Sequence, residues 1–406
     1  MNVLSLLGEL TEVGRNPTSG GYDRLAWTSA DAELRGWFTQ TAHARGLEVE
    51  TDRNGNLWAW WHAELPGTAL VVGSHLDSVP SGGAYDGPLG VASAFAAIAQ
   101  LQDAGVLPGR PVAVVAFADE EGARFGVACA GSRLMAGALD PDRARNLRDV
   151  DGITLAEAFA ATGRDAVHLG ADDARMRRIG EFVELHVEQG HLPSSTGEDG
   201  LGAAPLGLAT SIWPHGRWRV DIRGQQNHAG TTRLADREDP MIGLARVILA
   251  VREAAGRERA LATVGRVQVH PGAVNAIPGE ATAWIDARAG EEDTVRRVLA
   301  EVARATGFSA TEESWTPETR FDEDLTIAVN GALGSLHGRG ELPLLPSGAG
   351  HDAGVLALAG IPTAMILVRN PSGVSHAPEE YADDDASLLG VDALAEVIRL
   401  RSRALA

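Results

Sequence analysis

Three short segments of the chain carry side chains that commonly bind divalent metals. Residues 73–78 (GSHLDS), 117–122 (FADEEG) and 184–190 (ELHVEQG) each place histidine or carboxylate side chains close together. Residues 86–87 (DG) and 375–378 (SHAP) add an aspartate and a third histidine. Imidazole nitrogens and carboxylate oxygens suit zinc and related divalent ions. This inventory fits a pair of metals that share one carboxylate, which indicates a hydrolase.

His75 and Asp77 are separated by one residue at the end of a predicted strand. Alternation along a strand places both side chains on one face, so Asp77 could accept the ring N–H of His75 and fix its tautomer. A surface His-x-Asp pair is the alternative. Asp86 follows nine residues after Asp77, directly before a predicted helix. It suits a bridging carboxylate, although the same position also suits a turn or helix-capping aspartate.

Glu120 and Glu121 are adjacent, so in an extended segment they point in different directions. One of them could bind metal while the other acts as a general base near the reacting water. An acidic pair on a solvated loop is the alternative. His186 lies in an alternating run, and His376 lies in a loop sequence. Each of these two histidines alone could be structural, but their occurrence with the other residues favours a metal centre.

The first half of the chain alternates between strand-like and helix-like segments. Strands are predicted over 68–73 and 111–117, with an alanine-rich helix over 89–104 between them. This order predicts a parallel sheet with right-handed crossovers. Ligands bind beyond the carboxyl ends of the strands in such sheets. His75 and Glu120 both fall at these positions.

The sequence pattern changes after a Pro-, Ser- and Gly-rich stretch at about 193–207, which predicts a smaller domain inserted within the larger one. The later elements are expected as strands near 217–222, 263–270 and 281–288, and as helices near 239–255 and 292–306. The predicted fold class is α/β, with a mostly parallel sheet flanked by helices in the catalytic domain. We expect that domain to span 1–207 and 318–406, with an inserted α+β lid and dimerisation domain over 208–317.

Composition excludes several classes of function. The chain has 406 residues, 44% of them hydrophobic, and a formal net charge of -20 from 55 acidic and 35 basic residues. This charge argues against nucleic acid and anionic membranes as partners, although a metal site can still bind an anionic substrate. The single cysteine, Cys129, allows no intrachain disulfide and suggests a reducing compartment. A buried structural thiol is expected there, with a nucleophile as the alternative.

No signal peptide or membrane span is expected. The first ten residues read as an amphipathic helix that lacks a basic region before an apolar core. No segment approaches the length of a membrane-spanning apolar run. We therefore expect a cytoplasmic protein.

These motifs, in this order, resemble the di-zinc aminoacylase and carboxypeptidase superfamily. The match is strongest with its branch of N-carbamoyl-L-amino-acid hydrolases, β-ureidopropionases and allantoate amidohydrolases, and it covers essentially the whole chain. Residues 184–190 are specific to that branch, because carboxypeptidases and aminoacylases usually carry a carboxylate where His186 stands. Residues 227–232 (NHAGTT), 275–278 (NAIP) and 348–353 (GAGHDA) also fit the branch.

The resemblance implies a role for each candidate residue. One metal would be bound by His75, Asp86 and His186, and the other by Asp86, Glu121 and His376. Glu120 would be the general base and then the acid that protonates the leaving nitrogen, with Asp77 beside it. Substrate contacts would come from His228 (of a partner subunit, on the scissile carbonyl), from Asn275 and Arg288 (on the carboxylate), and from Gln189 nearby.

Charge arithmetic supports an anionic substrate. Two divalent ions are offset by Asp86, Glu121, a bridging hydroxide and ionised Glu120, which leaves Arg288 to pair with a carboxylate. A surface arginine at a strand end is the alternative for Arg288. One residue departs from the family pattern, since many members carry glutamine where this chain has His215. Imidazole and carboxamide offer different hydrogen-bonding groups, so His215 bears on which N-acyl group is removed.

We therefore expect a homodimeric metalloamidohydrolase. A water that bridges two divalent ions, activated by Glu120, would attack the carbamoyl C–N bond of an N-carbamoyl-L-amino acid or of allantoate. Zinc is the expected metal, and Mn2+, Co2+ or Ni2+ suit the same ligands. Alternative functions are hydrolysis of another small N-acyl amino acid such as N-formylglutamate, a dipeptidase or aminoacylase, and a metal-free binding protein on the same fold.

Overall fold

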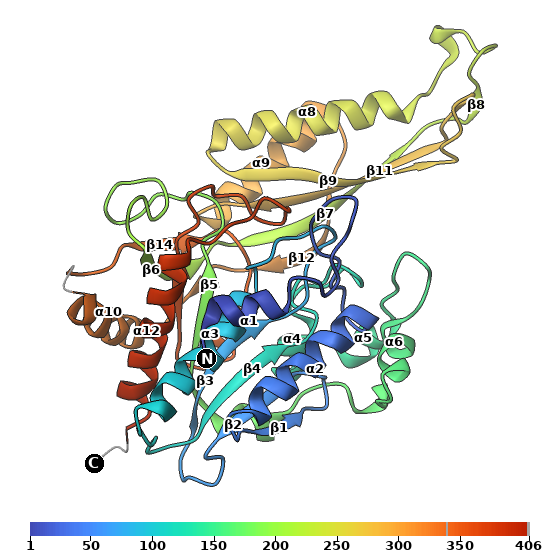
Figure 1. Cartoon of the computed structure of the whole chain (residues 1–406). Coiled ribbons are helices and arrows are strands. Elements are labelled where there is room, and N and C mark those ends of the chain that lie inside the picture. Colours follow the sequence, from blue (N-terminus) through green and yellow to red (C-terminus); the bar gives the residue numbers. More distant parts are fainter. Residues whose placement is uncertain (338–339, 404–406) are drawn as a thin grey trace. The chain divides into compact units, whose positions relative to one another are not determined.

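The computed structural model describes residues 1–337 and 340–403 of the chain. The chain forms two compact units, Met1–Ser211 with Arg320–Ala406, and Ile212–Thr319 (Figure 1). The sequence predicted these boundaries at 207/208 and 317/318. The second unit is therefore an insertion within the first.

The first unit is built on one nine-stranded sheet. Its strands are β1 (Glu48–Thr51), β2 (Leu57–Trp61), β3 (Ala69–His75), β4 (Val112–Phe117), β5 (Ile179–Val187), β6 (Leu206–Ile212), β13 (Thr319–Arg320), β14 (Leu344–Ser347) and β15 (Thr363–Val368). Its helices are α1 (Val3–Glu9), α2 (Ser29–His43), α3 (Pro88–Asp103), α4 (Ala130–Met135), α5 (Pro141–Asn146), α6 (Leu155–Ala161), η1 (Ala166–His168), α7 (Asp173–Arg178), α10 (Glu323–His337), α11 (Asp352–Leu358) and α12 (Asp384–Arg401).

The centre of this sheet is parallel, as predicted. The strand order is β1-β2-β4-β3-β5-β15-β6-β13, with β14 beside β6. The pairs β3–β4, β3–β5 and β5–β15 are parallel, whereas β2–β4 and β6–β15 are antiparallel. The carboxyl ends of β3, β4 and β5 therefore meet at one edge, where parallel sheets bind ligands.

Helices cover both faces of the sheet. On β5, Val183 and Leu185 lie in the large apolar core that includes α3, α12 and α1. The intervening Glu184 faces the other side, where it accepts the backbone N–H of Ala353 in α11. Since successive strand residues point to opposite faces, α3 and α11 lie on opposite sides of β5. In the part of the chain that is described, no helix is both long and apolar enough to cross a membrane.

The second unit is an antiparallel sheet with two long helices. Its strands are β7 (His215–Arg223), β8 (Asn227–His228), β9 (Leu261–His270), β10 (Ala276–Ile277), β11 (Glu280–Arg288) and β12 (Thr311–Thr316), and its helices are η2 (Leu234–Asp236), α8 (Pro240–Glu258) and α9 (Glu292–Thr306). Four strands run in the order β12-β7-β11-β9, and β8 pairs separately with β10. Buried valines of α9 recur with helical spacing and join α8 and the sheet in a separate apolar core.

The predicted linker over 193–207 ends too late. Its last residues, Leu206 and Gly207, already belong to β6, which pairs with β15 in the main sheet. The small residues next to them have a composition that is typical of linkers. The close packing of this strand explains the composition instead, because Gly207 faces Leu201 and the backbone of Pro343 without room for a side chain.

Gly73 lies in the middle of β3 at φ 145°, and a Cβ there would lie 2.0 Å from the carbonyl oxygen of Val115 on β4. Gly73→Ala should lower the free energy of unfolding by about 2–4 kcal/mol, because it combines backbone strain with overpacking. Chemical denaturation would measure this. Gly36→Ala is the matched control, since α2 leaves open space there and alanine favours helix by up to about 1 kcal/mol. Equal stability of both variants would contradict the assigned close contact.

Candidate metal centre

Two neighbouring parallel strands deliver the first two histidines. His75 is the last residue of β3 and His186 lies near the end of β5. Both side chains are about 1% exposed, and their rings lie 6.0 Å apart between centroids. The parallel pairing of β3 and β5 thus brings together two residues that are far apart in the sequence.

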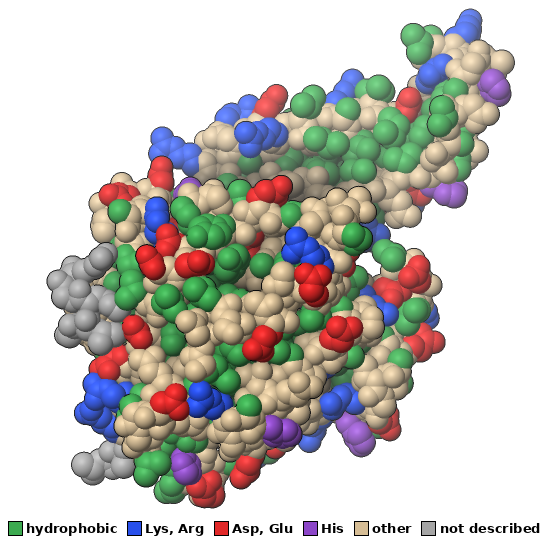
Figure 2. All heavy atoms as spheres, viewed as in Figure 1, with side chains coloured by type: hydrophobic (Ala, Val, Ile, Leu, Met, Phe, Trp, Pro, Cys, Tyr) green, Lys and Arg blue, Asp and Glu red, His purple; other side chains and the backbone are tan. Residues whose placement is uncertain are grey.

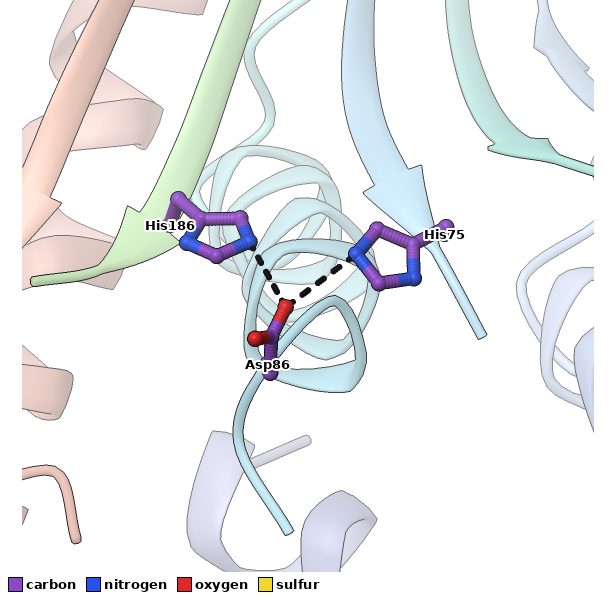
Figure 3. A group of neighbouring side chains, drawn as sticks. All are labelled: His75, Asp86 and His186. Atoms are coloured by element: carbon purple, nitrogen blue, oxygen red, sulfur yellow. Dashed lines mark ion pairs between the residues drawn. The ribbon is translucent and has the colours of Figure 1, made fainter. Parts of the chain in front are cut away.

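Asp86 lies between these histidines, in the loop that precedes α3 (Figure 3). Its Oδ1 is 3.3 Å from Nε2 of His75 and 3.1 Å from Nε2 of His186. Asp86 is not the helix cap that its sequence position also suited, because Gly87 occupies that position. The three side chains form a group that could hold one metal ion.

Backbone carbonyls determine the tautomer of both rings. Nδ1 of His75 lies 3.0 Å from the carbonyl oxygen of Asp77, and Nδ1 of His186 lies 2.9 Å from that of Val187. A carbonyl can only accept, so in the neutral rings Nδ1 carries the proton and Nε2 keeps its lone pair. Within the described residues, neither buried Nε2 has a hydrogen-bond partner. This is the arrangement that a metal-binding histidine requires.

Asp77 orients the glutamates more directly than it orients His75. Its Oδ1 and Oδ2 accept the backbone N–H groups of Glu120 and Glu121, each at 3.1 Å. Its carboxylate is 3.7 Å from Nδ1 of His75, whereas its own backbone oxygen is closer. The expected carboxylate–histidine bond is therefore replaced by a bond to the backbone oxygen of Asp77. Asp77 instead fixes the segment that carries both glutamates.

A second group shares Asp86 through its other oxygen. Nε2 of His376 lies 3.3 Å from Oδ2 of Asp86 and 3.4 Å from Oε2 of Glu121. These three residues form another group that could hold a metal. His376 differs from the other two histidines because it lies in a loop at φ 56° and its side chain is 49% exposed. Asp86 is thus placed to bridge two ions.

The buried carboxylates around Asp86 need positive charge nearby to compensate their negative charge. Burial, reinforced by Asp86, raises the pKa of Glu121 to about 7. The pKa of His376 rises to about 9, since its contacts with Asp86 and Glu121 outweigh the opposing effect of burial. Protons or divalent cations can satisfy this demand, and they compete for the same ligand atoms. The donor set, the vacant lone pairs and the excess of carboxylate all fit a pair of divalent ions.

Glu120 lies beside these groups and belongs to none of those found among the described residues. Its Oε2 is 3.8 Å from Nε2 of His75, and its Oε1 accepts the thiol proton of Cys129 at 3.3 Å. Burial raises the pKa of Cys129, so the thiol stays protonated and is unsuited to nucleophilic attack. Glu120 is near the centre without being needed as a ligand, which is the position of a general base.

No site role was predicted from the sequence for Glu184 or His351, which are buried next to His186. Glu184, His186 and His351 form a third group of possible metal ligands. Glu184 is already engaged, since it accepts the hydroxyl of Ser74 at 2.7 Å and the N–H of Ala353 at 3.1 Å. The alternation of Glu184 with His186 along β5 was the available signal. Their positions indicate that Glu184 and His351 support His186.

The candidate substrate residues of the inserted unit fall into two pairs. His215 and Arg288 lie opposite each other on β7 and β11, and Nε and Nη2 of Arg288 both donate to Oδ1 of Asp286. At the other end of these strands, His228 pairs with Ala276, and the backbone oxygen of Asn275 accepts the N–H of Ala229. The structure therefore groups Asn275 with His228 and Arg288 with His215. Gln189 lies in the first unit, where its amide contacts Asp86.

Comparisons with known proteins agree with this site. The family model described as peptidase family M20/M25/M40 matches residues 71–400. N-carbamoyl-L-amino acid amidohydrolase of Geobacillus stearothermophilus is 35% identical over 397 residues, which cover 96% of this chain and 95% of that protein. Allantoate amidohydrolase of Escherichia coli K12 is 32% identical over 398 residues, covering 95% and 94%.

A solved structure shares the fold as well. The crystal structure of an amidase of the hydantoinase/carbamoylase family from Burkholderia vietnamiensis matches with a TM-score of 0.88 and 30% identity. The match covers 98% of this chain and 96% of that one. Both units and the metal centre thus fall within the region of similarity.

The two adjacent glutamates should separate metal binding from proton transfer. Glu120→Gln should retain about two divalent ions per chain but lose at least about 100-fold in turnover, because an amide cannot carry the proton. Glu121→Gln should instead bind metal about 10–100-fold more weakly, since it lies beside His376 and Asp86. Metal analysis after dialysis, together with rates at saturating metal, would measure both. The reverse pattern would exchange the two assignments.

Proposed function

Since the chain belongs to peptidase family M20/M25/M40, we propose that it cleaves the carbamoyl C–N bond of an N-carbamoyl-L-amino acid or of allantoate, using two divalent cations. The chain is an amidohydrolase that acts on C–N bonds other than peptide bonds. The observation that carries the proposal is Asp86, whose two oxygens face two separate groups of ligands, with Glu120 beside them.

The proposed reaction depends on proton transfer by Glu120. When bound, two divalent cations would lower the pKa of a water molecule and polarise the substrate carbonyl. Glu120 takes a proton from the water as the water oxygen attacks the carbamoyl carbon. The same carboxyl group then gives that proton to the amino nitrogen as the C–N bond breaks. The products are carbamate, which decomposes to ammonia and carbon dioxide, and either the free amino acid or, from allantoate, a ureidoglycine-type compound.

The surroundings of Glu120 support both steps. The Cys129 thiol occupies one carboxylate oxygen of Glu120, and Asp77 fixes the backbone of residues 120 and 121. The carboxylate is held in one orientation before substrate arrives, which reduces the ordering that the transition state requires. Burial raises the pKa of Glu120 well above its usual value, and the positive charge of bound cations would oppose this rise.

Residues of the inserted unit are proposed to bind the substrate. Arg288 would pair with its carboxylate, and Asp286 supports this role because it holds two guanidinium nitrogens of Arg288 in place. His228 would donate to the scissile carbonyl. Nδ1 of His228 accepts the N–H of Gly230 at 3.0 Å, so a neutral ring carries its proton on Nε2, as a donor must. Asn275 would act together with His228.

A second candidate function is the hydrolysis of another small N-acyl amino acid, such as N-formylglutamate. His215 bears on this candidate, because the resemblance to the amidohydrolase branch implies glutamine at its position. Nδ1 of His215 lies 2.8 Å from the carbonyl oxygen of Trp213, so the neutral ring would keep Nε2 as an acceptor. A carboxamide can donate and accept at once, so the two side chains would favour different acyl groups.

Dimerisation through the inserted unit is also part of the proposal. Strand β9 forms one edge of its sheet and is largely exposed along its length. Exposed apolar side chains on β9 and α8 extend this surface (Figure 2), namely Leu261, Val267, Ile242, Ile248 and Leu249. Exposed strand edges and apolar patches are common features of protein interfaces. A second copy of the chain would cover both.

The proposed function is tested by a product-resolved panel of substrates. Wild-type protein would be supplied with N-carbamoyl-L-amino acids, 3-ureidopropionate, allantoate and N-formylglutamate, with ammonia and formate measured separately. Ammonia from the carbamoyl or allantoate substrates is expected. Formate alone would favour the second candidate, and no turnover of any of these compounds would reject both.

The same panel separates two substrate residues. Arg288→Ala should reduce kcat/KM for all substrates alike, by an amount corresponding to about 2–5 kcal/mol, because a carboxylate would be left unpaired. His215→Gln should change the ranking of the substrates, since it alters only polar contacts at the acyl end. An unchanged ranking would mean that His215 does not select the acyl group.

Hybrid dimers would test whether His228 acts on the partner subunit. Inactive His228→Ala chains mixed with inactive Glu120→Gln chains should recover part of the activity, because one site of the hybrid combines intact residues from both chains. Subunit exchange would be followed by mass spectrometry of differently tagged chains. Absence of recovery despite exchange would place His228 in the site of its own subunit. Mixing two Glu120→Gln preparations is the control.

A further inference from the structure

Glu380 is a buried carboxylate that connects two ligand-bearing loops. Its Oε1 accepts the backbone N–H groups of Tyr85 and Asp86, each at 2.9 Å. Its Oε2 accepts a hydrogen bond from the hydroxyl of Ser375 at 2.9 Å. Ser375 directly precedes His376 in the chain. The approach is close, because a Cβ at Gly83 would lie 2.2 Å from Oε1 of Glu380. One carboxylate thus joins the loop of Asp86 to the loop of His376.

Ser375 and Gln189 extend this connection to the bridging carboxylate itself. Nε2 of Gln189 lies 2.7 Å from Oδ2 of Asp86 and 3.0 Å from Oγ of Ser375. Oγ of Ser375 is also 3.2 Å from Oδ2 of Asp86. A hydroxyl has one proton, and the shorter distance favours Glu380 as its acceptor. Gln189, expected near the substrate, is here engaged with a metal ligand.

The three histidines differ in how firmly the fold holds them. His75 and His186 end buried parallel strands, whereas His376 lies in a half-exposed loop. Asn370 holds the start of that loop, since its side chain donates to the carbonyl of Val374 at 2.8 Å and accepts the N–H of Gly373 at 3.2 Å. Ser375, next to His376, contacts Glu380, Gln189 and Asp86, and Glu380 also accepts two backbone N–H groups from the loop of Asp86.

We propose that Glu380 is a positioning residue that sets the separation of Asp86 and His376, and thereby controls filling of the cation position formed by Asp86, Glu121 and His376. The first position, formed by His75, Asp86 and His186, depends on it much less, because strands place both of its histidines. This inference rests on the two-cation centre proposed above. It assigns to Glu380 a role that the ligand set alone does not reveal.

Two substitutions at Glu380 distinguish position from charge. Glu380→Ala removes the acceptors for Tyr85, Asp86 and Ser375. Glu380→Gln removes the charge, but its amide oxygen can accept both backbone N–H groups while its NH2 group donates to Ser375. The hydroxyl of Ser375 can then turn to Oδ2 of Asp86. A positioning role therefore predicts that glutamine restores what alanine loses.

The experiment is a competitive zinc titration of the stripped, full-length protein against a chromophoric chelator. Wild type should bind two ions. In Glu380→Ala the second ion should bind about 10–100-fold more weakly while the first changes by less than about threefold, as expected when a partner of a ligand is removed. Glu380→Gln should recover the second affinity to within about threefold. Ser375→Ala should fall between these variants.

Cobalt substitution adds a readout of geometry. The visible spectrum of the two-cobalt form should change in Glu380→Ala and return towards that of wild type in Glu380→Gln. Glu379→Gln is the matched control, because this neighbour is exposed and should leave both the titration and the spectrum unchanged. Thermal melts would be recorded for every variant. If Glu380→Ala does not fold, Glu380→Gln and Ser375→Ala still test the proposal.

The outcomes separate this inference from the proposed function. Wild-type protein that binds fewer than two ions would reject the two-cation centre itself. Two ions in wild type and equal affinities in Glu380→Ala would overturn the inference alone. Equal weakening of zinc binding at both positions would show that Glu380 has only a general structural role, and would overturn the inference. A Glu380→Gln variant as weak as Glu380→Ala would show that charge, and not position, matters, and would overturn the inference too.

Discussion

The burial of several carboxylates around Asp86 is the constraint on which the rest of the structure depends. Isolated buried charges are very costly unless opposite charge or hydrogen bonds compensate them. Two of these carboxylates that are not proposed as ligands, Glu184 and Glu380, accept hydrogen bonds from backbone N–H groups and serine hydroxyls. Among the described residues, Oε1 of Glu121 is buried without a hydrogen-bond partner, and burial raises the pKa of this group to about 7. The remaining need for positive charge is what a cation pair would satisfy.

The fold meets this constraint with elements of unequal rigidity. Parallel strands bring His75 and His186 together through backbone pairing, which is maintained along the buried centre of the sheet. Loops bring Asp86 and His376, and their positions depend on side-chain hydrogen bonds. A metal centre built in this way has one part defined by the sheet and another defined by polar contacts. Substitutions distant from the ligands can therefore affect the two cation positions differently.

The sequence predicted the elements whose pattern is local. The helix predicted over 292–306 coincides with α9, because its valines repeat with one clear period. The proximity of His75 and His186 could be predicted because strand ends in a parallel sheet converge, whatever the exact register. By contrast, Leu206 and Gly207, the first two residues of β6, were predicted to end a linker, since the packing of Gly207 against Leu201 and Pro343 is visible only in the tertiary structure. Asp77 was predicted to contact His75 through its carboxylate, but the contact is made by its backbone oxygen, because the carboxylate accepts the N–H groups of Glu120 and Glu121.

The position of Cys129 allows direct measurement of the stability of the segment over residues 118–131, which carries the proposed base Glu120. Cys129 is the only cysteine of the chain, it is 3% exposed, and its thiol lies against Glu120. A thiol reagent can reach it only when the segment around residues 118–131 opens. When opening is fast and reversible, the labelling rate divided by that of a free thiol gives the free energy of this local opening. A single residue placed beside the proposed base thus reports how often that part of the protein leaves its native conformation.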